Sequence, residues 1–190
     1  TGYQVMVDGA TKVVNFVNCK FANQNYSNGL YLAYGQRLLA IGTIASTQGT
    51  NENVTCTNCE FDGQGSQPYG VTTGGTTEGV VKTYGDFSAT NCWFHDPPKD
   101  HVTILGDVWS FTGCYFQCPG KTTAGGIYIA PPTDPQHVDN FHIYRGTGSF
   151  TGCFFDNWDG IVPGIMGSWT SSWFYVQALS GSNIDATFNR

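Results

Sequence analysis

The fold of this chain follows from one short pattern that occurs five times: NFVNCKF (15–21), CTNCEF (56–61), ATNCWF (89–94), FTGCYF (111–116) and FTGCFF (150–155). In each copy an Asn or a Gly precedes the cysteine, and a Phe follows it two places later. Asn and Gly adopt a positive φ more readily than other residues, so this column predicts a tight corner of the backbone. Recurrence of the corner indicates a repeat architecture.

The apolar positions on the two sides of each corner are out of phase. Before the corner, the apolar residues lie three and mostly five places ahead of the cysteine, with Gly148 as the exception, while the position four places ahead is polar. Side chains alternate along a strand, so a slip by one residue indicates two short strands joined by a bend. Both strands then face a common interior.

A third strand is expected in each repeat, in runs of alternating apolar residues that mostly begin at a glycine. These runs are 2–9, 29–35, 69–75, 101–106, 125–131 and, more weakly, 160–167. Three strands per repeat, stacked in register, predict a parallel β-solenoid. The shortest coil runs from Cys92 to Cys114, and in the longer coils we expect insertions at about 36–52, 74–85 and 131–146.

The chain is similar to the right-handed parallel β-helix superfamily that includes pectate lyases, polygalacturonases and bacteriophage tailspikes. The Asn before each of Cys19, Cys59 and Cys92 matches that family's Asn-bearing turn between its second and third sheets. The resemblance implies an all-β, single-stranded right-handed β-helix of about five to six coils with long loop insertions over residues 1–165. Residues 166–190 would form a C-terminal capping or oligomerisation tail. The resemblance concerns architecture and does not specify an activity.

Composition excludes several classes of function. The 190 residues carry a net charge of −6 with only 12% charged residues, and no window gathers more than two Lys or Arg, so nucleic acid is disfavoured as a partner. No apolar run approaches the length of a membrane-spanning helix, and no cofactor is predicted. Cys56 and Cys59 form a single CxxC whose corner turns both thiols inward, so no metal is predicted there either.

The cysteines are expected to mark the fold. Those of the five copies should form an inward column of buried thiols, with Cys56 as a further core thiol, although neighbouring coils would be close enough for a disulfide. Cys118 lies outside the pattern, and we expect it to be the exposed one. Redox surroundings stay undecided.

The residue between Cys and Phe points outward in every copy, and three of these residues are large aromatics on consecutive coils: Trp93, Tyr115 and Phe154. Exposed aromatics in a row favour one of two roles. They are typical of interface cores, and we expect a contact with another subunit or with a folded-back loop. They would also suit a platform on which the sugar rings of a linear glycan stack.

Candidate catalytic residues are few. Asp62, Asp96 and Asp156 follow the Phe of their coils, and Asp62 and Asp96 on neighbouring coils would stand about 5 Å apart, as in a retaining glycosidase. Aspartate is also common in turns for local hydrogen-bonding reasons. The four histidines show no metal-ligand spacing and are expected on the surface or in loops.

These observations lead to one main hypothesis and two alternatives. The coil strand at Gly2–Asp8 predicts an open N-terminal end, covered by further segments or by other virion proteins. With few charged groups available for catalysis, we expect a structural or adhesive module of a virus particle, such as a tailspike, tail fibre or capsid fibre. It would be homotrimeric, would lie at the virion surface or outside the cell, and would contact surface polysaccharide. The alternatives are an endoglycosidase-type depolymerase and a bacterial surface adhesin.

Overall fold

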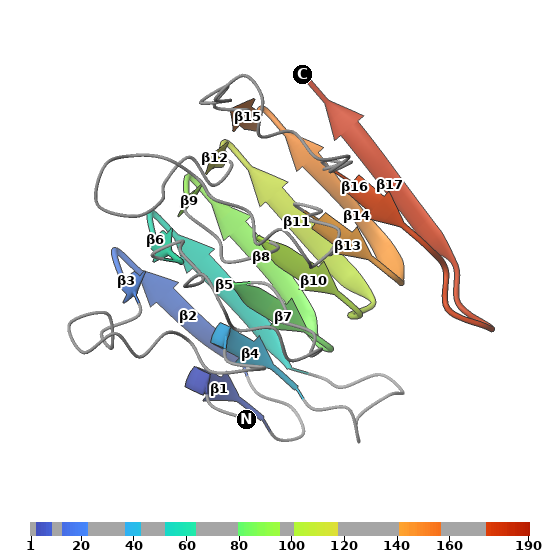
Figure 1. Ribbon diagram of the computed structural model, residues 1–190, viewed down its shortest axis with the longest axis horizontal. Helices are drawn as coiled ribbons and strands as arrows, with labels where there is room; N and C mark the ends of the chain where they lie inside the picture. The colour runs from blue at the N-terminus through green and yellow to red at the C-terminus, as the bar shows by residue number, and fades with distance from the viewer. Residues whose placement is uncertain are drawn as a thin grey trace, which may run out of the picture.

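The chain forms a parallel β-solenoid in this computed structural model, which describes residues 3–8, 13–22, 37–42, 52–63, 80–95, 101–117, 141–156 and 174–190. Successive strands contribute in turn to three parallel sheets, here called A, B and C (Figure 1). Sheet A contains β1 (Tyr3–Val7), β4 (Arg37–Ile41), β7 (Val81–Thr83), β10 (Val102–Ile104), β13 (Phe141–Ile143) and β16 (Phe174–Val176). Sheet B contains β2 (Val13–Val17), β5 (Asn53–Thr57), β8 (Asp86–Thr90), β11 (Val108–Thr112), β14 (Gly146–Thr151) and β17 (Ile184–Asn189). Sheet C contains β3 (Lys20–Ala22), β6 (Glu60–Asp62), β9 (Trp93–His95), β12 (Tyr115–Gln117) and β15 (Phe154–Asp156). The predicted all-β solenoid of five to six coils is confirmed.

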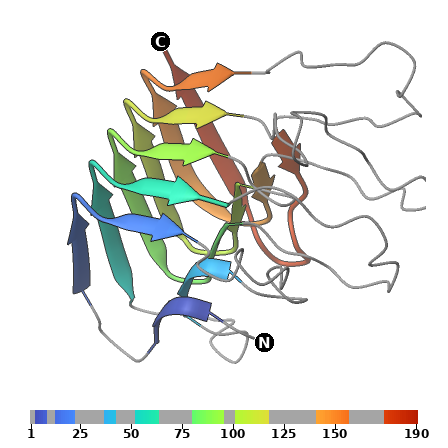
Figure 2. The same ribbon diagram turned by 60° about the vertical axis from the view of Figure 1, so that its left-hand side comes forward.

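The predicted corners lie between sheets B and C (Figure 2). All five corner residues have a positive φ: 55° at Asn18, 53° at Asn58 and Asn91, 61° at Gly113 and 60° at Gly152. The corners are stacked, because the amide of Asn58 donates to the carbonyl of Thr90 at 3.0 Å and the amide of Gly113 to that of Thr151 at 2.8 Å.

The core is built largely from stacked aromatic rings. In sheet C one Phe per coil points inward, and neighbouring rings are parallel at centroid distances of 4.6, 4.5, 4.8 and 5.2 Å along the series Phe21, Phe61, Phe94, Phe116, Phe155. A second stack in sheet B joins Phe111, Phe150 and Phe188 at 5.0 and 5.2 Å. Burying a Phe side chain contributes about 1.5–3 kcal/mol, so the repeated Phe is a main source of stability.

Sheet A differs from the prediction in four of its six coils. The expected strands at 29–35, 69–75, 125–131 and 160–167 lie outside the described residues. The paired strands of those coils are β4, β7, β13 and β16, and three of them fall within the ranges expected to be insertions. In two of these coils the sheet A strand lies directly before sheet B, because only two residues separate β7 from β8 and β13 from β14. Longer connections follow β4 and β16.

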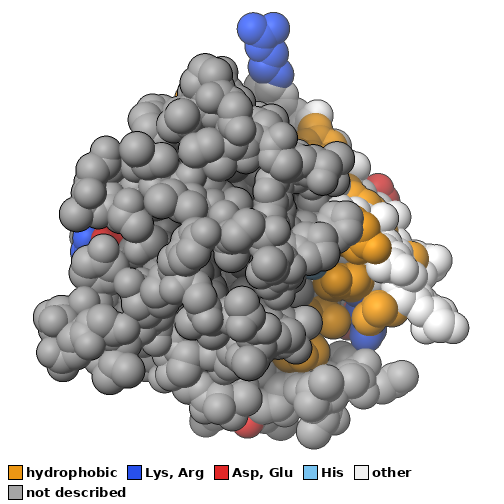
Figure 3. Space-filling model, in the orientation of Figure 1, with side chains coloured by type: hydrophobic (Ala, Val, Ile, Leu, Met, Phe, Trp, Pro, Cys, Tyr) orange, Lys and Arg blue, Asp and Glu red, His pale blue; other side chains and the backbone are white. Residues whose placement is uncertain are grey.

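The solenoid pairing continues beyond residue 165. Strand β16 pairs with β13, and β17 pairs with β14 over six residue pairs, so the 166–190 segment adds strands to sheets A and B. Several of its apolar side chains are exposed, namely Val176, Leu179 and Phe188. Figure 3 shows hydrophobic side chains uncovered on the side where β16 and β17 lie. A capping or oligomerising role for this segment stays a prediction.

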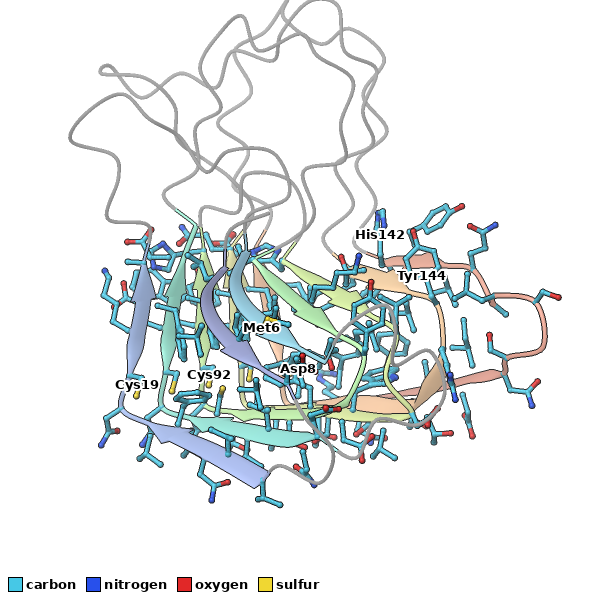
Figure 4. All side chains as sticks on the ribbon, turned by 90° about the horizontal axis from the view of Figure 1, so that it is seen from below. Met6, Asp8, Cys19, Cys92, His142 and Tyr144 are labelled. Carbon is cyan, nitrogen blue, oxygen red and sulfur yellow. The ribbon has the colours of Figure 1, made fainter. Side chains whose placement is uncertain are left out.

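The cysteines of the repeated pattern point into the interior, as predicted. Cys59, Cys92 and Cys114 are buried, while Cys19 and Cys153 at the two ends of the column are partly exposed. Figure 4 shows Cys19 and Cys92 in one row along the sheets. All six cysteines among the described residues, including buried Cys56, are free thiols, and Cys118 lies outside the described residues. In the part of the chain that the structure describes, no helix is long and apolar enough to cross a membrane.

Candidate functional site

The outer face of sheet C carries the residues that the sequence singled out. Each strand of this sheet has three residues. The central Phe faces the core, so the two flanking residues face outward. Parallel pairing places these outward residues in two columns. The first column is Lys20, Glu60, Trp93, Tyr115 and Phe154, and the second is Ala22, Asp62, His95, Gln117 and Asp156.

Trp93, Tyr115 and Phe154 form a continuous row, here called the aromatic row. The ring centroids of Trp93 and Tyr115 are 6.4 Å apart with an interplanar angle of 18°, and those of Tyr115 and Phe154 are 5.5 Å apart at 35°. Trp93 is 40% exposed and Phe154 62% exposed. The outward placement is therefore confirmed, whereas the role of the row in binding or assembly stays a prediction.

A hydrogen bond orients the central ring of the aromatic row. The hydroxyl of Tyr115 donates to Oδ2 of Asp156 at 2.6 Å. This bond, which favours the protonated phenol, raises the pKa of Tyr115 above its ordinary value. Asp156, a candidate catalytic residue from the sequence, thus contacts the aromatic row directly.

A charged cluster of Lys20, Glu60, Asp62 and His95 lies at one end of the aromatic row. Nζ of Lys20 is 2.7 Å from Oε1 of Glu60 and 3.1 Å from Oδ2 of Asp62. Nε2 of His95 donates to the same Oε1 of Glu60 at 3.0 Å. The imidazole is stacked on Trp93 at a centroid distance of 3.8 Å, which joins the cluster to the aromatic row.

The pKa values of this cluster reflect its ion pairs. Partial burial raises the pKa of Glu60, but the hydrogen bonds from Lys20 and His95 outweigh it, and the net pKa is lowered. The pKa of Lys20 is raised, first by its hydrogen bond to Glu60 and then by that to Asp62. The carboxylate of Glu60 is therefore held in its charged form.

Three members of the cluster could in principle hold a metal ion. Glu60, Asp62 and His95 each offer one ligand atom, and these atoms all lie within 4.8 Å of one another. Two carboxylates and an imidazole are a donor set that zinc accepts. However, the cation that both carboxylates contact in this structure is the ammonium of Lys20.

Two of the histidines are not at the surface, contrary to the expectation. His95 and His101 are buried, and His142 is partly buried in β13. Nε2 of His101 lies 2.9 Å from the carbonyl of Gln117, and because a carbonyl only accepts, Nε2 carries the proton. The ring of His101 packs against Phe116 and Phe141. Residue 101 was expected to begin a strand, but β10 begins at Val102, so alternation along the strand does not place this side chain. His137 lies outside the described residues.

The structure describes only one member of the candidate pair Asp62 and Asp96. Asp62 pairs with His95 on the next coil, and Asp96 lies outside the described residues. A catalytic role for either aspartate stays a prediction. The contacts of Asp62 that the structure describes include the ion pair with Lys20.

A second aromatic group, which the sequence did not single out, lies on the outer side of sheet A. Nδ1 of His142 is 3.1 Å from the hydroxyl of Tyr144, and the ring of Tyr175 lies 5.1 Å from that of His142 (Figure 4). This group includes one exposed ring, Tyr175, which lies outside the aromatic row and can be replaced as a control.

Comparison with known proteins identifies no family. No family model and no solved structure matches the chain. Among curated proteins, the chain is similar to tripeptidyl-peptidase sed5 of Aspergillus fumigatus, with 27% identity over 153 residues. This alignment covers 77% of the chain but only 23% of the peptidase, so the chain spans less than a quarter of the length of that relative.

Proposed function

We propose that this chain is a structural and adhesive β-solenoid module that binds a linear surface glycan along the outer face of sheet C. The observation that carries the proposal is the aromatic row, in which three rings stand in register on consecutive coils and two of them are well exposed. Flat apolar rings with a polar handle are suited to stacking against sugar rings.

The surroundings of the aromatic row support a saccharide ligand. Gln117 and Asp156 lie in the adjacent outward column. Gln117 is on the same strand as Tyr115, and Asp156 is on the same strand as Phe154. A polysaccharide presents hydroxyl groups beside its apolar faces, and such groups can be hydrogen-bonded by carboxylates and amides. The charged cluster would contact the same polysaccharide at one end of the aromatic row.

The biological setting of the proposal comes from the resemblance to bacteriophage tailspikes and related right-handed β-helices. We propose a virus particle, of the tailspike, tail-fibre or capsid-fibre kind, in which the module is homotrimeric and faces the outside. Polysaccharide binding and trimer formation would then use different surfaces of the solenoid, and both are testable with the isolated chain.

The test is binding of the purified chain to an array of bacterial surface polysaccharides. Substitution of Trp93→Ala is expected to weaken binding about tenfold or more, as removal of an aromatic anchor does. The matched control is Tyr175→Ala, which removes an exposed ring from sheet A and should leave binding unchanged. Equal binding by the Trp93 variant and the native chain would overturn the proposal.

Assembly is measured on the same variants, because an aromatic row is also typical of subunit interfaces. Light scattering coupled to size exclusion gives the mass in solution. We expect a trimer whose mass does not change when Trp93 is replaced. If Trp93→Ala instead converts the trimer to a monomer, the aromatic row is a subunit interface and the glycan proposal fails.

A further inference from the structure

The outer side of sheet B carries two adjacent columns of small polar side chains, here called the hydroxyl face. Side chains alternate along each strand, so the residues on either side of an inward core residue face outward. The first column, at the middle of the strands, is Asn15, Thr55, Ser88, Ser110, Ser149 and Thr187. The second column, next to the corners, is Val17, Thr57, Thr90, Thr112, Thr151 and Asn189.

The hydroxyl face carries no charged side chain. Five of the six residues in the first column and four of the six in the second are Ser or Thr. The acids on the outer side of sheet B, Asp86 and Asp185, lie in a third column toward the start of the strands. The outer face of sheet C, by contrast, carries ion pairs. The ligand that complements the hydroxyl face is therefore uncharged and is recognised through hydrogen bonds.

The side chains of the hydroxyl face are held in place by contacts along the columns. Oγ of Ser110 donates to Oγ of Ser88 at 2.9 Å, and the hydroxyl of Thr55 donates to Oδ1 of Asn15. Threonine is in addition stiff at χ1, because its Cβ is branched. A face that is ordered in advance loses little side-chain entropy when it binds.

No described strand covers the hydroxyl face. Every described strand belongs to one of the three sheets, and Figure 1 shows the six strands of sheet B side by side from β2 to β17. Thr112 and Thr187 are exposed, and the other Ser and Thr residues of the face are partly exposed. The hydroxyl groups can therefore reach a flat ligand from coil to coil.

The hydroxyl face has two regular repeats. Neighbouring strands are about 4.7–4.9 Å apart, and residues two places apart on a parallel strand are about 6.6 Å apart. In-register pairing extends these repeats over six coils, so the side chains form a two-dimensional lattice. The rows of oxygen atoms on a prism face of hexagonal ice repeat at nearly the same two distances.

We propose that the hydroxyl face binds ice. A hydroxyl group has one donor and two acceptor lone pairs, so it can take the place of a water molecule at the edge of the lattice. The methyl groups of threonine fill the spaces between the rows of oxygen atoms. Water molecules bridging the ordered hydroxyl groups complete the contact.

Ice also matches the charge of this face. A lattice of water molecules is uncharged, and it presents donors and acceptors at fixed intervals, as the two columns do. The inference goes beyond the proposed glycan binding, because it uses sheet B and none of the residues of the aromatic row. The two surfaces can therefore be tested separately on one chain.

The experiment measures thermal hysteresis, which is the depression of the freezing point of an ice crystal below its melting point in a solution of the purified chain. We expect hysteresis with the native chain. Thr90→Lys is expected to remove most of it, because an ammonium group has no favourable place in an uncharged lattice. The matched control is Tyr175→Lys, which adds the same side chain to sheet A and should leave the hysteresis unchanged.

Uptake into ice gives a second measurement. An ice crystal grown slowly in the solution takes up a chain that binds its surface and leaves other chains in the liquid. Absence of both hysteresis and uptake with the native chain would overturn the proposal. Circular dichroism confirms that the variants keep their β-structure, and Thr112→Lys, in the same column, replaces Thr90→Lys if that variant fails to fold.

The two proposed surfaces are separated by exchanging their variants. Trp93→Ala should keep the full hysteresis of the native chain, and Thr90→Lys should keep its binding to polysaccharide. Loss of hysteresis in Trp93→Ala, or equal losses in Thr90→Lys and Tyr175→Lys, would show that the hydroxyl face is not the ice-binding surface.

Discussion

Gly148 shows how a single residue is determined by its neighbour on the previous coil. In the inward column of sheet B it pairs with Trp109, and a Cβ built at Gly148 would collide with the indole ring and the carbonyl oxygen of Trp109. The sequence identified Gly148 as the exception in an otherwise apolar column. Its cause, the large ring on the preceding coil, follows only from the register.

We expect Gly148→Ala to destabilise the fold by about 1–3 kcal/mol, as overpacking of a core does. Urea unfolding followed by circular dichroism measures this loss. The matched control is Gly152→Asn: Gly152 has a φ of +60° with nothing within 4 Å of a Cβ, and three other corners carry Asn at this position. The control should unfold near the native midpoint, and equal losses in the two variants would contradict the explanation.

The charged cluster makes stability depend on pH through Glu60. Its pKa is lowered in the folded state, so its contribution is present above the ordinary carboxyl pKa of about 4.3 and is lost as the pH falls through the lower folded value. Unfolding by urea at a series of pH values should show this loss on the acid side.

Glu60→Gln is expected to flatten that part of the profile, because the amide does not titrate. Replacement of an exposed acid on β17, Asp185→Asn, is the control and should leave the profile as it is. If both variants keep the acid-side slope of the native chain, the ion pairs of Glu60 do not stabilise the fold.

At the scale of elements, sheet C and the first five strands of sheet B were predictable, whereas β17 and most of sheet A were not. These strands flank a corner whose Asn or Gly, cysteine and Phe occur in five coils, so the five copies define them. Strands β7 and β13 have three residues and no such marker, while glycine-rich alternating runs elsewhere gave a stronger strand signal. For these two strands the two-residue turn before sheet B was the better guide.

The same distinction applies to the candidate site. The aromatic row follows from alternation along single strands, which the sequence shows. The charged cluster depends on which residues of neighbouring coils are level, and Asp62 proved to be level with His95. Burial of His95 under Trp93 likewise depends on side-chain packing across one strand, which alternation does not describe.

The stacked Phe rings of sheet B predict a gradient of stability along the solenoid. Phe111 is fully buried, and Phe111→Ala should cost about 3–5 kcal/mol. Phe188 on β17 is 54% exposed, although it stacks on Phe150 and contacts Phe174 edge to face, so Phe188→Ala should cost less than Phe111→Ala, about 1–2 kcal/mol. Urea unfolding compares the two, and similar losses would show that β17 is covered in solution.

At the scale of the whole molecule, the described strands of each coil pair only with strands of the coil before it and of the coil after it. Stability in such a molecule is close to a sum of coil and interface contributions. The central coils have two neighbours, whereas β1 and β17 are edge strands among the described residues.

Amide hydrogen exchange should follow this arrangement. We expect the slowest exchange in β8 and β11 and faster exchange toward β1 and β17, because local opening begins where a strand has one neighbour. Mass spectrometry of peptic fragments resolves these segments. Uniform protection along the chain would indicate that other copies cover the ends, and the mass in solution would then show an assembly.

The corner residues have a consequence for the length of the molecule. The coil from Cys92 to Cys114 takes 22 residues, and its strands pair with the neighbouring coils. It is therefore a repeating unit of defined length. Inserting a copy of this unit would lengthen the rod by about 4.8 Å and extend every column of side chains by one position. A protein of this design can therefore set its reach by the number of coils that its gene encodes, without a change in the surfaces that its neighbours meet.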